Sequence, residues 1–391
     1  MAFVCPPGTV PHPFLMAPRL LIDARLPHVA GLGRYVRESA LALAQLGCFA
    51  EIVLVGDGAA WAPTVRQMAG RARVHHVPWH RHDLRVPLWL HRTVVPLAAG
   101  AVTWFPHWDA AWRGPWSGAA PDDPRRPVTT LHDLILVDRG GVGARVVAAW
   151  MRRVLSASRG FVTGTRASHD AFVARFPEVA GRVAIVPHGV APACFAAGAA
   201  AEAPGEHRPP AGAPYLLAVA TKRPHKRLEV AIAALAQLAA TDPALRLVLV
   251  GERTPHLTVL RALAQRLGVA HRVDEEAGLS DEALAARYAG AEAVLVCSQA
   301  EGFGMVPLEA MAAGAPVVAA RHAATDEVVG AAAALVPPDD ADAMAAVVRR
   351  WRGAPAARAA QVRAGRAHAA RFTWARSAEA LAERLLAQGA P

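Results

Sequence analysis

Hydrophobic positions follow two alternating patterns along the chain. Short apolar runs rich in β-branched residues are typical of buried strands, and longer Ala-, Leu- and Arg-rich segments with apolar residues every three to four positions are typical of helices. In the first half, this pattern predicts strands at 20–23, 51–56, 73–78, 101–106, 128–133, 160–164 and 183–187. It predicts helices at 33–46, 143–156 and 166–176.

The alternation stops after Ala191 and restarts near Tyr215. The intervening stretch is rich in Ala, Gly and Pro without a period, which predicts a flexible linker. Beyond it, strands are expected at 215–220, 245–252, 293–298, 316–321 and 333–336, and helices at 227–239, 256–267, 281–289 and 306–313. From 341 to 388 the pattern is helical, with breaks near 353–355 and 372–374.

Strands that alternate with helices predict βαβ units and parallel sheets. The fold class expected is therefore α/β, with two Rossmann-like domains whose sheets face a cleft where a ligand would bind. The expected boundaries are an N-terminal domain at 17–195, a linker at 196–213, a C-terminal domain at 214–371, and a final segment at 372–391 crossing back as a helix to the first domain.

Composition narrows the class of protein. Of 391 residues, 53% are hydrophobic and 19% charged, so the chain can bury large cores. Its four cysteines lie far apart without metal-ligand or disulfide spacing. No apolar run reaches the about 18 residues of a membrane span, and the N-terminus is a poor signal peptide. These features predict a cytoplasmic protein.

The charge balance of +10 has several interpretations. An anionic membrane, nucleic acid, a phosphorylated substrate or an ordinary Arg-rich surface would each fit it. One helix, around 143–155, carries Arg145, Arg152 and Arg153 beside Val, Trp150 and Met151. That pattern would allow peripheral contact with an anionic membrane, on its inner face for a cytoplasmic protein.

The segment SQAEGFGMVPLEAMAAG at 298–314 carries the strongest chemical signal. A buried strand ends at Ser298, a glycine loop follows, and Pro307 suits the first turn of the next helix. Free amides at such a helix start, together with its dipole, favour a phosphate. Two carboxylates straddle this loop and would suit sugar hydroxyls, although a plain turn with capping or solvent-exposed glutamates has the same pattern. They are Glu301 and Glu309.

This segment resembles the donor-site motif of family 4 glycosyltransferases, which are retaining enzymes of the GT-B architecture. The resemblance implies that Glu309 holds the ribose hydroxyls of a nucleotide sugar and that Glu301 lies near the transferred sugar. It also implies that loop amides cradle donor groups, at Gly302, Phe303, Gly304, Met305 and Val306. The resemblance makes the domain at 214–371 the nucleotide-sugar donor domain and the domain at 17–195 the acceptor side.

A basic loop, TKRPHKR, follows the strand that ends near Ala220 and contains both lysines of the chain. A lysine retained where every other basic residue is arginine suggests a need for a compact point charge. The loop resembles the phosphate-binding loop of the same family, which implies that Lys226 meets the donor diphosphate. The family's second cation is not matched, and Arg223 is the residue we choose for it.

Two motifs in the first half extend the resemblance. The segment AGLGRY resembles the family's glycine-turn signature, which implies donor contact at Gly31 and Gly33 and places Arg34 and Tyr35 facing the cleft. The segment TLHDL puts His132 at a strand end, where the family has a histidine lining the sugar site. Asp133 would orient His132 or cap the next segment, and His107 is a weaker acceptor-side candidate.

The sequence therefore predicts a metal-independent hexosyltransferase that uses a GDP-, UDP- or ADP-sugar as co-substrate and has no other cofactor. Lys226, Glu301 and His132 are its predicted catalytic residues, and family resemblance favours GDP-mannose. The acceptor expected is a glycan or lipid-linked glycan, and no nucleic acid is expected as partner. Two alternatives stay open: a GT-B-like nucleotide-sugar epimerase or hydrolase, and a non-catalytic basic binding module.

Overall fold

The computed structural model describes residues 17–26, 30–77, 95–98, 100–109, 123, 125–138, 140–202 and 213–387. Two compact units make up the chain. The first consists of residues up to Gly189 together with Trp374 onward, and the second spans Val190–Thr373. The chain therefore passes between the units twice, at 189/190 and at 373/374.

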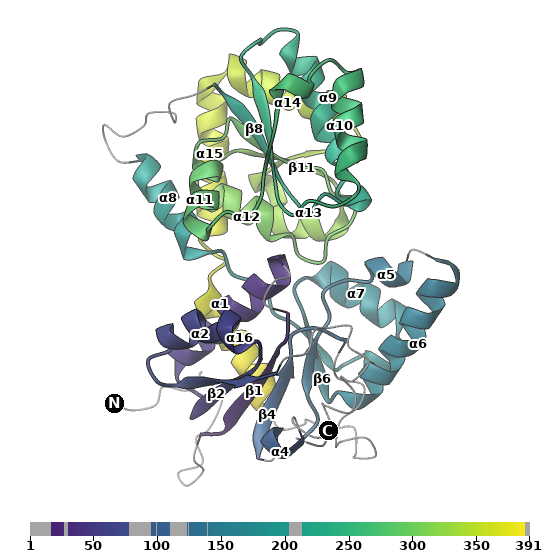
Figure 1. Ribbon diagram of the computed structural model, residues 1–391, viewed down its shortest axis with the longest axis vertical. Coiled ribbons are helices and arrows are strands. Elements are labelled where there is room, and N and C mark those ends of the chain that lie inside the picture. The colour runs from purple at the N-terminus through teal and green to yellow at the C-terminus, as the bar shows by residue number, and fades with distance from the viewer. Residues whose placement is uncertain are drawn as a thin grey trace. The chain divides into compact units, whose positions relative to one another are not determined.

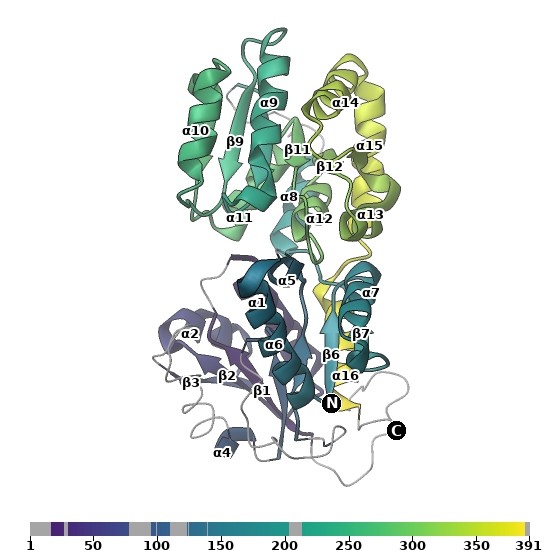
Figure 2. The same ribbon diagram turned by 90° about the vertical axis from the view of Figure 1, so that its right-hand side faces the viewer.

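The first unit contains a seven-stranded parallel sheet in the order β3-β2-β1-β4-β5-β6-β7 (Figures 1 and 2). Its strands are β1 Arg19–Ala24, β2 Glu51–Gly56, β3 Ala72–His76, β4 Ala101–Phe105, β5 Val128–Thr130, β6 Gly160–Thr163 and β7 Val183–Ile185. Its helices are α1 Ala30–Leu46, α2 Gly58–Gln67, α4 Val95–Ala98, α5 Ile135–Asp138, α6 Gly141–Ala157, α7 Arg166–Arg175 and α16 Trp374–Leu386, with a 3-10 turn, η2, at Pro177–Val179.

Helices cover both faces of this sheet (Figure 2). On one face, Val154 and Ala157 of α6 pack in a common cluster with Leu21, Val53 and Phe105 of the strands. Elsewhere in the unit, α16 packs against α1 and contacts β4 and β6. The last helix of the chain thus completes the first unit rather than the second.

The second unit contains a six-stranded parallel sheet in the order β10-β9-β8-β11-β12-β13. Its strands are β8 Tyr215–Val219, β9 Arg246–Val250, β10 Val273–Glu276, β11 Ala293–Val296, β12 Val317–Ala320 and β13 Ala334–Val336. Its helices are α8 Pro192–Glu202, α9 Leu228–Ala239, α10 Leu257–Arg266, α11 Asp281–Ala289, α12 Met305–Ala312, α13 Ala323–Val329, α14 Ala341–Gly353 and α15 Pro355–Ala369. The 3-10 turns are η3 Pro224–Lys226, η4 Ala270–Arg272 and η5 Gly330–Ala332.

The side-chain alternation of β8 shows why its sequence is continuously apolar. Leu217 belongs to the core that includes residues of α11 and α12, whereas Leu216 belongs to the core that includes residues of α9, α10 and α14. Successive strand residues point to opposite faces, so a parallel strand covered on both sides is apolar throughout. The predicted α/β class with two Rossmann-like parallel-sheet domains is confirmed.

The predicted linker is wrong for residues 192–202, which form α8. Alanine-rich sequence has high helix propensity, and α8 packs against α11 and α12. A Cβ atom at Gly198 would lie 2.1 Å from the carbonyl oxygen of Ala312, so only glycine permits this approach. Residues 203–212 of the predicted linker lie outside the described part of the chain.

Candidate donor and acceptor sites

The order of strands in the second unit identifies where a ligand would bind. Connections lead outward in opposite directions from the neighbouring strands β8 and β11, which makes this the topological switch point of the sheet. Ligands of open α/β sheets bind outside the carboxyl ends of strands at such a point. The basic loop follows β8 and the glycine loop follows β11, so both predicted donor motifs lie at this edge.

Lys226 and Glu301 form an ion pair across these two loops. The Lys226 Nζ donates to Glu301 Oε1 at 2.7 Å, and both side chains are about one-fifth exposed. The backbone N–H of Gln299 donates to the carbonyl of His225 at 3.0 Å, which ties the loops together. The structure therefore brings two of the three predicted catalytic residues into direct contact.

Asp339 joins a third loop to the same edge. Its carboxylate accepts from Arg227 Nε at 2.6 Å and from Gln299 Nε2 at 3.1 Å. The hydrogen bond from Arg227 is the main cause that lowers the pKa of Asp339. The neighbouring Asp340 caps α14 by accepting from the N–H of Ala343, so this acidic turn opens a helix.

The glycine loop leads directly into α12. Gly304 is its N-cap residue with φ 81° and ψ 74°, a left-handed conformation that favours glycine. No side chain caps this end of the helix, so the first-turn amides of Met305 and Val306 point toward the switch point as possible anion donors. The Phe303 side chain is buried against Phe372, so only its backbone could contact a ligand.

The carboxylate of Glu309 is buried inside the second unit. It is 1% exposed, and its Oε2 accepts a hydrogen bond from the hydroxyl of Tyr288 at 3.1 Å. Tyr288 therefore fixes the orientation of this carboxylate, a role that no motif indicated because tyrosines at this spacing are ordinary core residues of a helix.

The two lysines lie in different environments. Lys222 is fully buried, and its Nζ donates to the carbonyl oxygens of Leu249 and Gly251 at the end of β9. Burial lowers the pKa of Lys222. Lys226 is partly exposed beside Glu301, whereas Arg223, our choice for the second cation, is exposed to solvent. Lys222 thus braces the base of the loop, and Lys226 is the lysine placed to meet a ligand.

At the carboxyl end of the first sheet, His132 follows β5. Its Nε2 lies 2.7 Å from the carbonyl oxygen of Pro106, and because a carbonyl oxygen only accepts, Nε2 carries a proton and donates it. Burial, and secondarily the nearby His107, lower the pKa of His132 to about 4. A pKa this low favours the uncharged ring at neutral pH, which suits a role in positioning a ligand or in accepting a hydrogen bond.

The expectation that Tyr35 faces an open cleft is wrong. Its ring is 1% exposed and contacts His132, His188, Trp104 and Trp374, all within the first unit. Its hydroxyl lies 3.3 Å from the Thr130 hydroxyl, which also accepts from Trp104 Nε1 at 3.0 Å. The Tyr35 ring therefore packs against the His132 ring and helps to fix its orientation.

The other predicted residues of the first unit have simpler positions. Gly31 and Gly33 lie in the first turn of α1 rather than in a turn before it, because the helix begins at Ala30. Arg34 follows them on α1 and is partly exposed. Asp133 accepts from the N–H of Ile135 at 2.9 Å, so of its two expected roles it caps the next segment. His107 stacks on Trp108 and lies 3.1 Å from Asp109.

Sequence reasoning missed a buried ion pair at the end of β1. Arg25 donates to both carboxylate oxygens of Asp23, at 2.8 and 2.7 Å, and is 5% exposed. The pair lies at the switch point of the first sheet, between β1 and β4. The sequence signal that could have revealed this pair is the presence of two oppositely charged residues at the end of an apolar strand.

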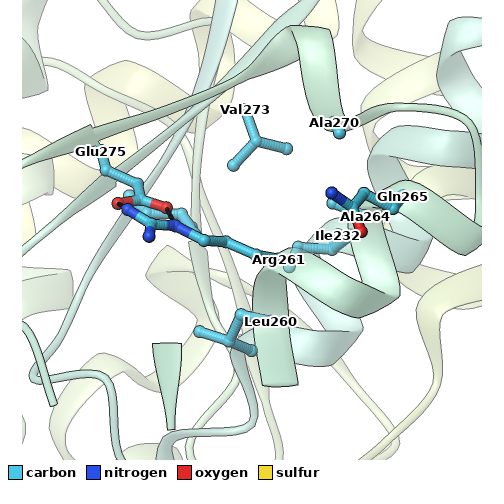
Figure 3. Close-up of a pocket in the computed structure, with 9 residues that line it drawn as sticks. Ile232, Leu260, Arg261, Ala264, Gln265, Ala270, Val273 and Glu275 are labelled. Carbon is cyan, nitrogen blue, oxygen red and sulfur yellow. Dashed lines mark hydrogen bonds and ion pairs between the residues drawn. The ribbon is translucent and has the colours of Figure 1, made fainter. Parts of the chain in front are cut away.

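A cavity of about 270 Å³ lies elsewhere in the second unit, between α10 and the β9–β10 edge. Apolar side chains such as Leu260 and Val273 line it, and Arg261 meets Glu275 at one side (Figure 3). None of the predicted site residues lines it. The cavity is therefore separate from the loops that carry the donor motifs.

Comparison with known proteins gives the class of fold first. The chain matches sucrose-phosphate synthase from Thermosynechococcus elongatus with a TM-score of 0.72 at 22% identity, over 94% of this chain and 97% of that one. It matches Anabaena HepE, solved with UDP and glucose, with a TM-score of 0.69 at 21% identity over 94% and 98% of the two chains. The fold is GT-B.

Sequence comparison then indicates the family. Residues 200–368 match the family model described as "Glycosyl transferases group 1". A D-inositol 3-phosphate glycosyltransferase from Acidothermus cellulolyticus is 33% identical over 270 residues, 65% of this chain and 60% of that protein. An MMP alpha-(1->4)-mannosyltransferase from Mycolicibacterium hassiacum is 45% identical over 96 residues, 24% and 23% of the two chains.

These matches confirm the resemblance to glycosyltransferases that the motifs indicated. The chain spans about 60% of the first of these relatives. The matched family segment covers all the strands of the second unit and the loops that carry Lys226 and Glu301. The two predicted donor motifs of the second unit therefore lie in the segment that matches the family model, whereas Gly31 and Gly33 lie outside it.

Proposed function

We propose that this protein is a retaining, metal-independent glycosyltransferase that moves a hexose from a nucleotide sugar to a glycan or lipid-linked glycan. The observation that carries the proposal is the Lys226–Glu301 ion pair at the switch point of the second sheet, beside the uncapped start of α12. A cation, a carboxylate and free amides at one edge of a sheet suit a sugar diphosphate. The resemblance of residues 200–368 to glycosyltransferases supports it.

The leaving group of such a transfer is a nucleoside diphosphate, whose negative charge grows as the sugar bond breaks. Lys226 would exchange Glu301 for a diphosphate oxygen, and the first amides of α12 would donate to the same group. Preorganised donors of this kind each contribute about 3 kcal/mol to transition-state stabilisation. The chain's own groups would thus neutralise the departing charge.

Glu301, released from Lys226, would bind hydroxyls of the transferred sugar. Glu309, whose orientation Tyr288 helps to fix, would accept from the ribose hydroxyls. In the first unit, neutral His132 would orient the sugar near the reacting carbon. These roles follow the family resemblance residue by residue, and the ion pair and the fixed carboxylate are the contacts that support them.

The nucleotide is tested by a thermal-shift screen of the full chain against GDP-mannose, UDP-glucose and ADP-glucose. A true donor at a hundredfold excess over its dissociation constant should add about 2.7 kcal/mol of stability. GDP-mannose is the donor we favour, and the mannosyltransferase relative supports it. HepE, solved with UDP, supports the uridine donor as the rival. No shift with any of the three would count against the donor site.

Two alternatives make different predictions. An epimerase or hydrolase would consume the donor rapidly without an acceptor, whereas a transferase would consume it slowly until acceptor is added. A non-catalytic basic module would bind polyanions but show no nucleotide-sugar turnover. Product analysis by NMR also tests retention, since the anomeric configuration of the donor sugar should persist. The predicted cytoplasmic location stays a prediction.

A further inference from the structure

Exposed apolar side chains are concentrated in one segment of the first unit. Of the six large hydrophobic residues exposed in the described part of the chain, four lie between positions 136 and 150. Val142 is 76% exposed and Val146 is 59% exposed, with Leu136 and Trp150 each near 40%. Single exposed apolar residues are ordinary, but a contiguous group of them marks an interaction surface.

The spacing of these residues places them on one stripe of α6. Val142, Val146 and Trp150 are separated by four residues each, so they lie one above another on the helix. The opposite side of α6 is buried through Ala148, Met151 and Leu155, among others. The helix α5, which carries Leu136, packs against α6 (Figure 1). We call the exposed side of these two helices, which carries Leu136, Val142, Val146 and Trp150, the α5–α6 surface.

Arginines lie on this stripe and along one side of it. Arg153 lies on it by helical spacing, and Arg145 and Arg152 flank one side; all three are exposed. Among the described residues, Glu178 of η2 lies 3.8 Å from Arg152, and α5 carries Asp138. The α6 helix itself contains no acidic residue, so its exposed side is positively charged.

Apolar side chains mixed with arginines fit a lipid surface better than a protein core. Arginine can place its apolar stem beside acyl chains and its guanidinium among anionic headgroups. In the described residues, no helix is long and apolar enough to cross a membrane. The α6 helix has the composition of a helix that lies along a membrane interface, with its exposed tryptophan and valines facing the lipid.

We propose that the α5–α6 surface docks this protein on an anionic lipid bilayer, with Val142, Val146 and Trp150 entering the headgroup region and Arg145 and Arg153 meeting lipid phosphates. This binding requires no nucleotide sugar. It therefore stands or falls independently of the proposed transfer reaction, and it would bring the enzyme to a lipid-linked acceptor.

Co-sedimentation of the full chain with vesicles tests the proposal, using phosphatidylcholine alone and phosphatidylcholine with 30% phosphatidylglycerol. We expect binding to the anionic vesicles that weakens with salt. The variant Arg145→Gln/Arg153→Gln should lower the partition coefficient about thirtyfold, since each arginine near an anionic surface contributes about fivefold. The variant Val142→Ser/Val146→Ser/Trp150→Ser should lose binding at every salt concentration.

The matched control is Val259→Ser/Leu267→Ser, which removes the two exposed apolar residues of the second unit. It should bind vesicles like the wild type. Thermal unfolding checks that all variants fold, which their exposed positions favour. Equal binding by the triple variant, or no wild-type binding to anionic vesicles, would overturn the proposal. A third result would also overturn it: the wild type forms a dimer in sedimentation velocity, the triple variant does not, and neither protein binds vesicles.

Discussion

The two units share one architecture but differ in chemistry at their switch points. In the second unit, ion pairs connect the loops after the strands, through Lys226 with Glu301 and Arg227 with Asp339. In the first unit, aromatic and imidazole rings pack against His132, and the buried ion pair Asp23–Arg25 lies at the end of β1. Equivalent edges of two similar sheets therefore present different surfaces to a ligand.

This difference indicates a division of labour. Partly exposed ion pairs are weak and exchange partners readily, which suits the capture and release of a charged diphosphate. Packed rings are rigid and keep His132 neutral, which suits the orientation of an uncharged sugar. The variants below test separately the ion-paired loops of the second unit and the ring cluster around His132 in the first unit.

The largest effect should come from Lys226→Ala. Loss of the cation should lower kcat/KM about 10²- to 10³-fold, equivalent to about 3 kcal/mol of transition-state stabilisation. Steady-state kinetics with the nucleotide sugar measure this. The matched control is Arg266→Ala at the C-terminal end of α10, outside both donor loops, which should retain full activity. Equal losses in both variants would refute a specific role for Lys226.

A pair of tyrosine variants compares the regions directly. Tyr288→Phe removes a hydrogen bond from the buried Glu309 and should cost about 2 kcal/mol of unfolding free energy. Tyr35→Phe should cost about 1 kcal/mol, because Trp104 still donates to Thr130. Urea unfolding gives these values. Only Tyr288→Phe should also raise the KM for the nucleotide-sugar donor. A raised donor KM in Tyr35→Phe would contradict the different roles proposed for the two units.

Acidification should weaken the first unit before the second. The pKa of His132 is lowered to about 4 in the folded chain, from an ordinary value near 6.5. A depressed histidine pKa gives stability that is present above pH 6.5 and lost as the pH falls toward 4. We expect about 1–2 kcal/mol to be lost between pH 7 and pH 5. Calorimetric unfolding of wild type and His132→Gln checks this, because the variant should show a flatter profile.

The smallest expected effect is a gain in binding affinity, in contrast to the losses above. Glu301→Gln removes the carboxylate that competes with diphosphate for Lys226, so nucleoside diphosphate should bind about threefold more tightly, as expected for a partly exposed ion pair. The same variant should transfer sugar more slowly. Weaker diphosphate binding in Glu301→Gln would show that Glu301 does not restrain Lys226.

Apolar patterning predicted most strands because they are buried on both faces, as at 215–219 and 293–296. It missed β10, whose sequence VDEE is polar because it lies at the sheet edge. It missed α2, which contains Pro63, and α8, whose alanines resembled a linker. Motifs located Lys226 and Glu301. Tyr288 was missed because it acts on Glu309 through a contact between two helices that no local pattern encodes, whereas the Asp23–Arg25 pair is local and was overlooked.

The central claim is that Lys226, at the switch point of the second unit, binds the donor diphosphate. Isothermal titration calorimetry with GDP, UDP and ADP, on wild type and Lys226→Ala, tests it most directly. We predict that one nucleotide binds the wild type and that Lys226→Ala weakens it about 10- to 100-fold, as expected for a charge-assisted hydrogen bond. Equal affinity in the two proteins would contradict the account.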